Sequence, residues 1–319
     1  MRALILNDTQ PDYAGVALEE VEAPHGAGLR IRVRAAAVTF VDLLMTSGGY
    51  QFKPPLPYGL GSDFAGEVLE AGGGFEVGDE VMGLARGGAF AEELRAAPET
   101  LMRKPAGWSM AEAAAFGQAY LTAYVALTRH AHLQPGEWLL VQGASGGVGL
   151  AAVDLGKRMG AKVIAASASD EKLSRIDAAY APDAVLNVRG GFREQVKEIT
   201  GGGAHVVYDP VGGDVFMESL RCTAYHGRVL IIGFASGTIP EVGMNYPLIK
   251  GLQMIGVRAG EYGRRFPDHA REDRAALAEM ASCEDAAPHV HATFPLTEWR
   301  AAFETMDERE VVGRVVLEP

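Results

Sequence analysis

Apolar and polar positions follow two different rhythms along this chain, and the first covers residues 1–115. Short apolar segments there are separated by glycine-rich turns, and Arg30-Ile31-Arg32-Val33-Arg34 alternates polar with apolar side chains, as a half-buried strand does. Ser109 and Glu112 have the spacing of a capping box, which predicts the start of an alanine-rich helix. Closely spaced short strands with glycine turns predict a compact, barrel-like β domain.

From Trp138 onward, short apolar runs alternate with segments of helical periodicity. The expected strands are residues 138–141, 162–166, 184–186, 205–208, 228–232 and 254–257. Strands joined by helices in this way predict a doubly wound parallel sheet and place the chain in the α/β class. The residues after 258 contain too few elements for a third domain. We therefore expect one domain formed by residues 1–118 and 259–319, and a second formed by residues 119–258.

A glycine-rich turn lies between the first of these strands and the helix that follows it. The turn reads Ala144-Ser145-Gly146-Gly147-Val148-Gly149, with alanine where the usual GxGxxG pattern has its first glycine. A strand, a glycine turn and a helix form the context in which this pattern binds a dinucleotide. Gly146 would let the backbone approach a pyrophosphate, Gly149 would let the helix pack closely on the strand, and the helix N-terminus would face the phosphates.

Composition narrows the functional classes. The chain has 319 residues, a length that is enough for two domains, and 48% of them are apolar, as in a globular protein. Its formal net charge of −12 argues against nucleic acid as a partner. Cys222 and Cys283 are too few for a disulfide framework, which favours a reducing compartment. The N-terminal residues lack the core of a signal peptide and no apolar run is long enough to span a bilayer, so we expect a cytoplasmic protein with no membrane partner.

Several motifs together give the chain a resemblance to a known family. They are residues 36–42 (AAVTFVD), 59–67 (GLGSDFAGE), 75–81 (FEVGDEV), 120–124 (YLTAY), 136–137 with 143–149, and 207–213 (VYDPVGG). In this combination they resemble the medium-chain dehydrogenase/reductase superfamily, and in particular its zinc-independent quinone oxidoreductase (zeta-crystallin-like) branch, over essentially the whole chain. The resemblance implies a GroES-like β-barrel catalytic domain, a Rossmann cofactor domain, and a homodimer joined through the cofactor domain near strand 254–257.

The resemblance also bears on zinc. The alcohol dehydrogenase relatives hold catalytic zinc with Cys and His at the positions that look like Thr39 and Ser62. Neither Thr nor Ser is a good zinc ligand, and the four-cysteine structural loop is absent. We therefore expect no metal and an acceptor that is already electrophilic. The chain departs from the branch at two positions. Thr39 stands where the branch usually has Asn, and Asp154 stands where it usually has Gln. The second difference affects helix packing more than chemistry.

The end of the second strand of the parallel sheet bears on the choice between NADH and NADPH. NAD-binding folds place Asp or Glu there for the ribose 2′-hydroxyl, whereas this strand ends in Ser167. In the resembling branch, residues at the positions of Ser167 and Lys172 contact the 2′-phosphate, although Lys172 also suits a solvated helix position. We predict NADPH as the cofactor. The predicted cofactor-binding residues are Thr122, Ala144, Ser145, Gly146, Gly147, Val148, Gly149, Ser167, Lys172, Val211, Gly233 and Phe234.

Tyr50 is the main candidate catalytic residue, and Thr39 is the second. Related enoyl reductases carry a catalytic-site tyrosine in a segment similar to Gly48-Gly49-Tyr50 and the proline bend that follows it. Hydride delivered to an enone leaves an enolate, and a phenol with a pKa near ~10 can protonate or hydrogen-bond the enolate oxygen. The alternative is that Tyr50 only packs against the proline bend. Asp42 and Asp63 form a weaker candidate acid/base pair.

These residues predict an NADPH-dependent reductase of a quinone or of an α,β-unsaturated carbonyl. A second hypothesis is an enoyl-CoA or acryloyl-CoA reductase, in which Arg258, Arg264 and Arg265 would attract the CoA group, although a solvated rim is the preferred interpretation of these arginines. A third hypothesis, from another class, is an NADPH-binding protein with little catalysis and a structural or sensing role.

Overall fold

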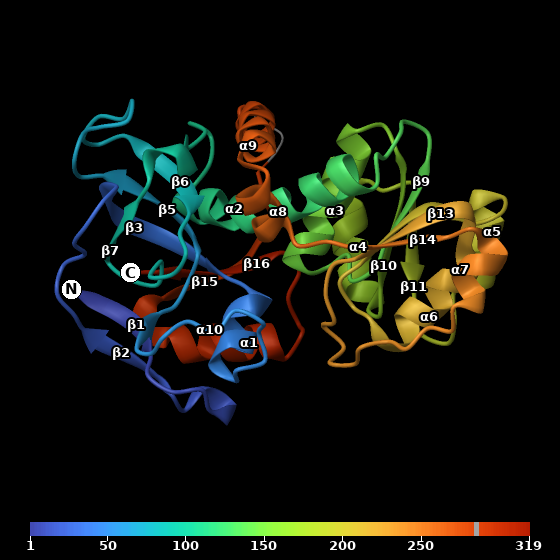
Figure 1. The fold of residues 1–319 in the computed structure, drawn as a ribbon, viewed down its shortest axis with the longest axis horizontal. Helices are drawn as coiled ribbons and strands as arrows, with labels where there is room; N and C mark the ends of the chain where they lie inside the picture. The colour runs from blue at the N-terminus through green and yellow to red at the C-terminus, as the bar shows by residue number, and fades with distance from the viewer. Residues whose placement is uncertain (284–286) are drawn as a thin grey trace. The chain divides into compact units, whose positions relative to one another are not determined.

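The computed structural model describes residues 1–283 and 287–319, and these form two compact units (Figure 1). The first unit contains Met1–Gln118 and Ala278–Pro319, and the second contains Ala119–Leu277. One boundary between the units falls after residue 118, within helix α2, Met110–Tyr124. The return to the first unit comes later than the expected position after residue 258.

The later return has a physical cause in the helix α9, Pro267–Ala281. Arg129 of the second unit donates to Asp273 Oδ1 at 2.9 Å and to Glu272 Oε2 at 2.7 Å. The ring of Tyr262 in the helix α8, Ala259–Arg265, also packs edge-on against His130, with 5.3 Å between the ring centroids. These contacts attach residues 259–277 to the second unit.

The first unit is rich in strands, as the glycine-punctuated pattern predicts. Its strands are β1 (Arg2–Leu6), β2 (Val16–Glu20), β3 (Leu29–Val38), β4 (Tyr58–Gly59), β5 (Asp63–Val68), β6 (Glu80–Leu84), β7 (Glu93–Ala96), β8 (Leu101–Arg103), β15 (Val290–Pro295) and β16 (Arg314–Glu318). One sheet has the order β2-β1-β4, and the larger one has the order β15-β16-β3-β5-β6-β8 with β7 also paired to β3. Strand β16 brings the C-terminal segment back beside β3 in antiparallel register.

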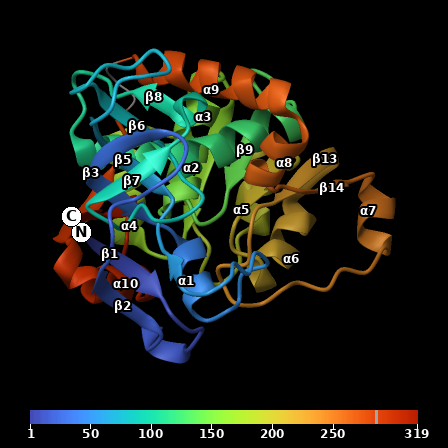
Figure 2. The same cartoon turned by 60° about the vertical axis from the view of Figure 1, so that its left-hand side comes forward.

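Among the described residues of the first unit, the helices α1 (Phe40–Thr46) and α10 (Trp299–Asp307) lie wholly within it. Figure 2 shows both close to the β1–β2 hairpin. The described residues of this unit also form short 3-10 turns at Pro11–Tyr13, Pro98–Thr100 and Leu296–Glu298. Helix α2 begins at the predicted capping box, because Ser109 N–H and Oγ both donate to Glu112 while Glu112 N–H donates back to Ser109 Oγ.

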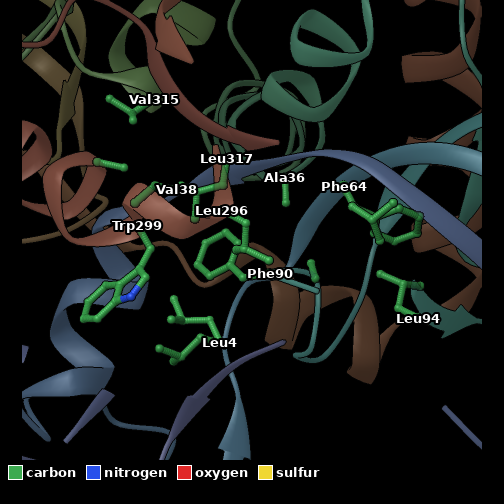
Figure 3. Close-up of a cluster of buried hydrophobic side chains, with 14 of the residues drawn as sticks. Leu4, Ala36, Val38, Phe64, Phe90, Leu94, Leu296, Trp299, Val315 and Leu317 are labelled. Atoms are coloured by element: carbon green, nitrogen blue, oxygen red, sulfur yellow. The ribbon is translucent and has the colours of Figure 1, made fainter. Parts of the chain in front are cut away.

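The core of the first unit forms where the buried face of β3 meets α10. Ile31 and Val33 are buried, whereas the arginines that alternate with them point outward. Arg30 pairs with Glu93, and Arg32 and Arg34 pair with Glu67, which confirms the predicted half-buried strand. Figure 3 shows Phe90, Trp299 and Leu4 packed together near β3 and β16, so segments far apart in sequence share one core. Burial of such side chains contributes roughly 1.5–3 kcal/mol each.

The second unit is built around one parallel sheet. Its strands are β9 (Trp138–Val141), β10 (Lys162–Ser167), β11 (Ala184–Asn187), β12 (Ala204–Asp209), β13 (Thr223–Ile231) and β14 (Gln253–Gly256). Their order is β11-β10-β9-β12-β13-β14, and every pair is parallel. This order is that of a dinucleotide-binding doubly wound sheet, in which ligands bind beyond the carboxyl ends of the strands where the order reverses. Strands β9 and β12 flank that point.

Helices cover both faces of this sheet (Figure 1). They are α3 (Gly147–Arg158), α4 (Asp170–Tyr180), α5 (Arg193–Thr200), α6 (Gly213–Cys222) and α7 (Asn245–Lys250), with a π-helical segment at Val125–His130. Helices α3 and α4 pack together on β9 and β10, and α5 and α6 pack together on β12. The sheet interior is apolar on both sides, with Leu140, Val207 and Val229 fully buried. Among residues 1–283 and 287–319, no helix is long and apolar enough to cross a bilayer.

Candidate functional site

The glycine turn after β9 adopts the close helix–strand packing that its sequence predicts. Gly143 supplies the turn with a φ of 57°, and Ala144 does not adopt a positive φ, which explains why alanine is tolerated there. Gly146 is the N-cap of α3. A Cβ added to Gly149 would lie 2.3 Å from the carbonyl oxygen of Gly143, so only glycine fits where the helix crosses the turn.

Some of the predicted turn residues are buried, and the others are partly exposed at the N-terminus of α3. Ala144 and Gly149 are fully buried, and Ala144 N–H donates to the Ala166 carbonyl at 2.9 Å, which joins the turn to the end of β10. Ser145, Gly146, Gly147 and Val148 keep partial exposure at the N-terminus of α3. A helix N-terminus carries backbone N–H groups without intrahelical partners and a partial positive charge, and both favour a phosphate.

The end of β10 places Ser167 beside this turn. Ser167 is largely buried, and its carbonyl accepts from Val188 N–H at 3.0 Å, which brings the end of β11 alongside. Ser169 caps the next helix, so Lys172 lies in the first turn of α4 and is half-buried. The nearby carboxylate of Asp170 accepts from Asn187 Nδ2 at 2.7 Å. The described residues therefore place a hydroxyl, and no carboxylate, at the end of β10 itself.

The loops after β12 and β13 are joined to each other and to the glycine turn. Ala235 N–H and Ser236 N–H donate to the carbonyls of Pro210 and Val211, each at 2.9 Å. A Cβ on Gly143 would lie 2.9 Å from Val211 Cγ2, so this loop also touches the turn after β9. The predicted residues Val211, Gly233 and Phe234, all half-buried, are thus gathered at the same carboxyl edge as the glycine turn. Thr122 is half-buried on α2, and its cofactor role stays a prediction.

In the first unit, Thr39 is the N-cap of α1 and forms a capping box with Asp42. Thr39 Oγ1 donates to Asp42 Oδ2 at 2.7 Å, Thr39 N–H donates to the same oxygen at 2.8 Å, and Asp42 N–H donates to Thr39 Oγ1 at 3.2 Å. Both side chains are only 3% exposed. Burial raises the pKa of Asp42 to about 6, against the lowering effect of the Thr39 hydrogen bonds.

Asp63 has a partner that sequence reasoning missed. Its Oδ2 accepts from Arg314, which lies 251 positions later on β16, and its Oδ1 accepts from Gln118 N–H at 2.7 Å. Asp63 is fully buried and Arg314 nearly so. Burial raises the pKa of Asp63, while Arg314 and the Gln118 N–H oppose that rise. A lone arginine leading the apolar strand β16 was the only signal in the sequence. Removing either partner of an ion pair this buried would leave an uncompensated buried charge.

Tyr50 follows α1 and is half-buried against the apolar core of the first unit. Its N–H donates to the Leu44 carbonyl at 3.2 Å, which fixes its backbone beside the helix. Among the residues that the structure describes, its hydroxyl has no protein hydrogen-bond partner. The packing interpretation and the catalytic interpretation of Tyr50 are therefore both compatible with its position. The assignments of Tyr50 and Thr39 as catalytic residues stay predictions.

The residues at the positions of the zinc ligands do not suit zinc. The Thr39 hydroxyl is engaged with Asp42, and Ser62 offers another neutral hydroxyl in place of an imidazole or thiolate. Outside the three residues that the structure leaves undescribed, no group of three or more His, Cys, Asp or Glu is arranged to hold a metal ion.

Two protein-family models match the chain. Residues 26–133 match the alcohol dehydrogenase GroES-like domain, and residues 147–277 match the family described as zinc-binding dehydrogenase. The mouse quinone oxidoreductase-like protein 2 is 38% identical over 310 residues, which cover 94% of this chain and 88% of the relative. The quinone oxidoreductase of Pongo abelii is 34% identical over 233 residues, which cover 71% and 70%.

The fold also matches solved structures. The quinone oxidoreductase from Thermus thermophilus, which was also solved in complex with NADPH, superposes with a TM-score of 0.82 at 30% identity over the full length of both chains. The expected GroES-like domain and Rossmann sheet are thereby confirmed. On these sequence and structural matches, the chain belongs to the medium-chain dehydrogenase/reductase superfamily, among its quinone oxidoreductase-like members.

Proposed function

We propose that this chain is an NADPH-dependent oxidoreductase that reduces a quinone or the activated C=C bond of an α,β-unsaturated carbonyl, without zinc. The observation that carries the proposal is the carboxyl edge of the second unit, where the open glycine turn, Ser167 and the joined loops at Val211 and Phe234 lie together. Gly146, the N-cap of α3, has no side chain to keep a pyrophosphate from the helix N-terminus. Bound NADPH would supply the hydride.

The end of β10 supports NADPH over NADH. A carboxylate at this position would hold a ribose 2′-hydroxyl and repel a 2′-phosphate, and Ser167 stands there instead. Asp170, one turn away, is engaged with Asn187. Lys172 in the first turn of α4 adds a positive charge close to the same edge. The T. thermophilus relative has been solved with NADPH, which supports the same choice.

The proposal that zinc plays no part rests on the donor atoms. Two neutral hydroxyls, Thr39 and Ser62, stand at the positions of the zinc ligands, and Thr39 already serves Asp42. Without a Lewis acid to lower the pKa of a bound alcohol, alcohol oxidation is less favoured, so an acceptor that is already electrophilic is the better substrate. Quinones and enones have that property.

Of the residues in this chain, we assign the substrate role to Tyr50. Reduction of an enone at the β-carbon leaves negative charge on the carbonyl oxygen, and a phenol can donate a hydrogen bond or a proton to that atom. Its backbone is held against α1, while its hydroxyl has no partner within residues 1–283 and 287–319. Thr39, buried in its capping box, would act on substrate only through the position of α1.

The acyl-CoA alternative receives less support from the arginines after β14. Arg264 and Arg265 both bond to Glu261, with their closest contacts at 2.8 Å, so one of their two positive charges is balanced within α8. Arg258 is exposed and precedes that helix. The positive charge that remains on these three arginines is less than a CoA group usually requires. The solvated-rim interpretation of Arg264 and Arg265 agrees with these contacts.

The experiment that tests the proposal measures NADPH consumption by the purified protein with an ortho-quinone, with a simple enone and with crotonyl-CoA. Turnover with the quinone or the enone is the expected result. Turnover with crotonyl-CoA alone would favour the acyl-CoA reductase. Tight NADPH binding with no turnover of any of the three would favour a structural or sensing role.

We also propose a homodimer formed through the second unit. Strand β14 has β13 on one side and is an edge strand of the described sheet. Large apolar side chains are exposed around it, among them Met244 at 77%, Leu248 at 81% and Ile249 at 71%. An apolar surface beside an open strand edge suits a second copy of the same surface. Leu248→Glu should convert a dimer to a monomer in sedimentation, and a wild-type monomer would refute the proposal. A cytoplasmic location stays a prediction.

A further inference from the structure

Asp209, the last residue of β12, is a buried carboxyl group that the proposed reaction does not use. It is 1% exposed. Its Oδ1 accepts two backbone hydrogen bonds, from Val211 N–H at 2.6 Å and from Gly212 N–H at 3.0 Å. Its Oδ2 is buried without a hydrogen-bond partner. A single oxygen atom therefore fixes the turn at residues 210–212.

That turn determines the shape of the carboxyl edge around it. Gly212 has a φ of 73°, and a Cβ there would lie 2.9 Å from Phe234 Cδ1 and from the Thr238 carbonyl oxygen. The Pro210 and Val211 carbonyls accept from Ala235 and Ser236. The turn at 210–212 is therefore hydrogen-bonded to the loop at residues 233–238 and holds it in place. Val211 also contacts the glycine turn at Gly143.

The contacts of Asp209 use its side chain as a hydrogen-bond acceptor for two backbone N–H groups. Burial raises the pKa of its carboxyl group, and the opposing influences are its two backbone N–H partners, with no cation among them. An unpaired buried charge is costly, whereas a neutral acceptor for two backbone N–H groups is not. An asparagine side chain offers the same acceptor with no charge.

We propose that Asp209 is a positioning residue that holds Val211, Gly233 and Phe234 in the arrangement that receives the nicotinamide half of the cofactor. The inference rests on the proposed function, because it takes those residues as part of the NADPH site. The adenosine half would bind at the opposite side of the glycine turn, at Ser167 and Lys172, and it does not depend on the turn at 210–212. A loop that spends less time in its binding shape lowers the apparent affinity in proportion.

The test compares two ligands in three proteins by direct binding. NADPH reaches both halves of the site, whereas 2′,5′-ADP occupies the adenosine half alone. In Asp209→Ala we expect the Kd for NADPH to rise about tenfold or more, with the Kd for 2′,5′-ADP within about twofold of wild type. In Asp209→Asn both constants should stay within about threefold of wild type, because the acceptor for the two N–H groups is retained.

The outcomes separate this inference from the proposed function. Equal weakening of both ligands in Asp209→Ala, or weakening of neither, would overturn the positioning role, as would an Asp209→Asn variant as impaired as Asp209→Ala. A wild-type protein that binds neither NADPH nor NADH would instead refute the proposed function. If Asp209→Ala does not fold, Asp209→Ser, which retains a shorter acceptor, is compared with Asp209→Asn. Weaker NADPH binding by the serine variant, with unchanged binding of 2′,5′-ADP, would support the positioning role. Equal NADPH affinities of the two variants would overturn it.

Discussion

The hydroxyl of Thr39 and the carboxylate of Asp42 bond to each other across the first turn of α1, with 2.7 Å between Thr39 Oγ1 and Asp42 Oδ2. Thr39 looks like the position where the alcohol dehydrogenase relatives carry a zinc ligand, and both Thr39 and Asp42 are almost completely buried. The same residue that excludes a good zinc ligand therefore starts the helix that leads to Tyr50. Its removal should be visible first as a loss of stability.

Thr39→Val keeps the shape of the side chain and removes the cap. We expect the free energy of unfolding to fall by about 1 kcal/mol, the usual cost of losing an N-cap hydroxyl, whereas Thr39→Ser should stay close to wild type. Urea unfolding of the three proteins measures this difference. A Thr39→Val protein that is as stable as wild type but has lost turnover would contradict the capping role and favour direct contact with substrate.

Asp42 should make stability depend on pH in a defined window. The unfolded chain releases this proton near 3.8 and the folded chain near 6, so between these values the folded state binds more protons. The contribution of Asp42 to the free energy of unfolding therefore falls as pH rises from about 4 to about 6, by on the order of 3 kcal/mol in total. Asp42→Asn removes the titration and keeps a side-chain acceptor. The difference in unfolding free energy between wild type and Asp42→Asn should shift in favour of the variant between pH 4 and pH 7, and a difference that is independent of pH would rule the effect out.

Elements with a local pattern could be predicted from the sequence. The alternation in β3, the strands of the parallel sheet and the glycine turn depend on neighbouring residues, and the structure places them as expected. Helix α7 has six residues with Pro247 near its start, too short for helical periodicity to reveal. The π-helical segment Val125–His130 continues α2 directly.

Contacts between distant residues could not be predicted in the same way. Arg314 meets Asp63 because β16 pairs with β3, and β3 pairs with β5, which is a property of the whole sheet. The role of Asp209 likewise depends on two loops that meet only when β12 and β13 are adjacent. Asp154, which stands where the branch usually has Gln, accepts hydrogen bonds from the side chains of Tyr120 and Arg158, both at 2.8 Å. These contacts agree with the expected role in helix packing.

Tyr50→Phe tests the substrate role while keeping the ring in the core. We expect kcat on an enone to fall at least about tenfold, the lower range for losing a general acid. Turnover of an ortho-quinone should change little, because hydroquinone oxygens can take protons from water. The quinone rate in the same variant is thus the control for folding and cofactor binding. Unchanged enone turnover would remove Tyr50 from the mechanism.

Lys172→Ala tests the assignment of the 2′-phosphate. We expect kcat/KM for NADPH to fall about tenfold, because a hydrogen bond to a charged group contributes about 1.5 kcal/mol or more, while the value for NADH stays the same. Arg175→Ala, on the same helix, is the matched control and should alter neither. Equal losses with both cofactors would argue against a phosphate contact, and a wild-type preference for NADH of tenfold or more would overturn the choice of NADPH.

Two alanine substitutions three residues apart should separate the structural glycine of the turn from the binding one. A Cβ on Gly149 would lie 2.3 Å from the Gly143 carbonyl oxygen, so Gly149→Ala must displace α3 and should cost about 1–3 kcal/mol of stability, as overpacking does. A Cβ on Gly146 would lie 3.6 Å from the same oxygen, an ordinary contact at a φ of −77°. Gly146→Ala should therefore fold with a loss of at most about 1 kcal/mol.

The binding measurements should rank the same two variants differently. The new methyl group of Gly146→Ala occupies the N-terminus of α3, where the backbone has to approach a pyrophosphate, so we expect the Kd for NADPH to rise about tenfold or more in a protein that remains folded. Thermal unfolding and NADPH titration of both variants provide the comparison. If Gly146→Ala binds NADPH as tightly as wild type, the pyrophosphate does not lie against this turn, because no rearrangement of an open helix N-terminus would hide an added Cβ from a ligand in close contact with it.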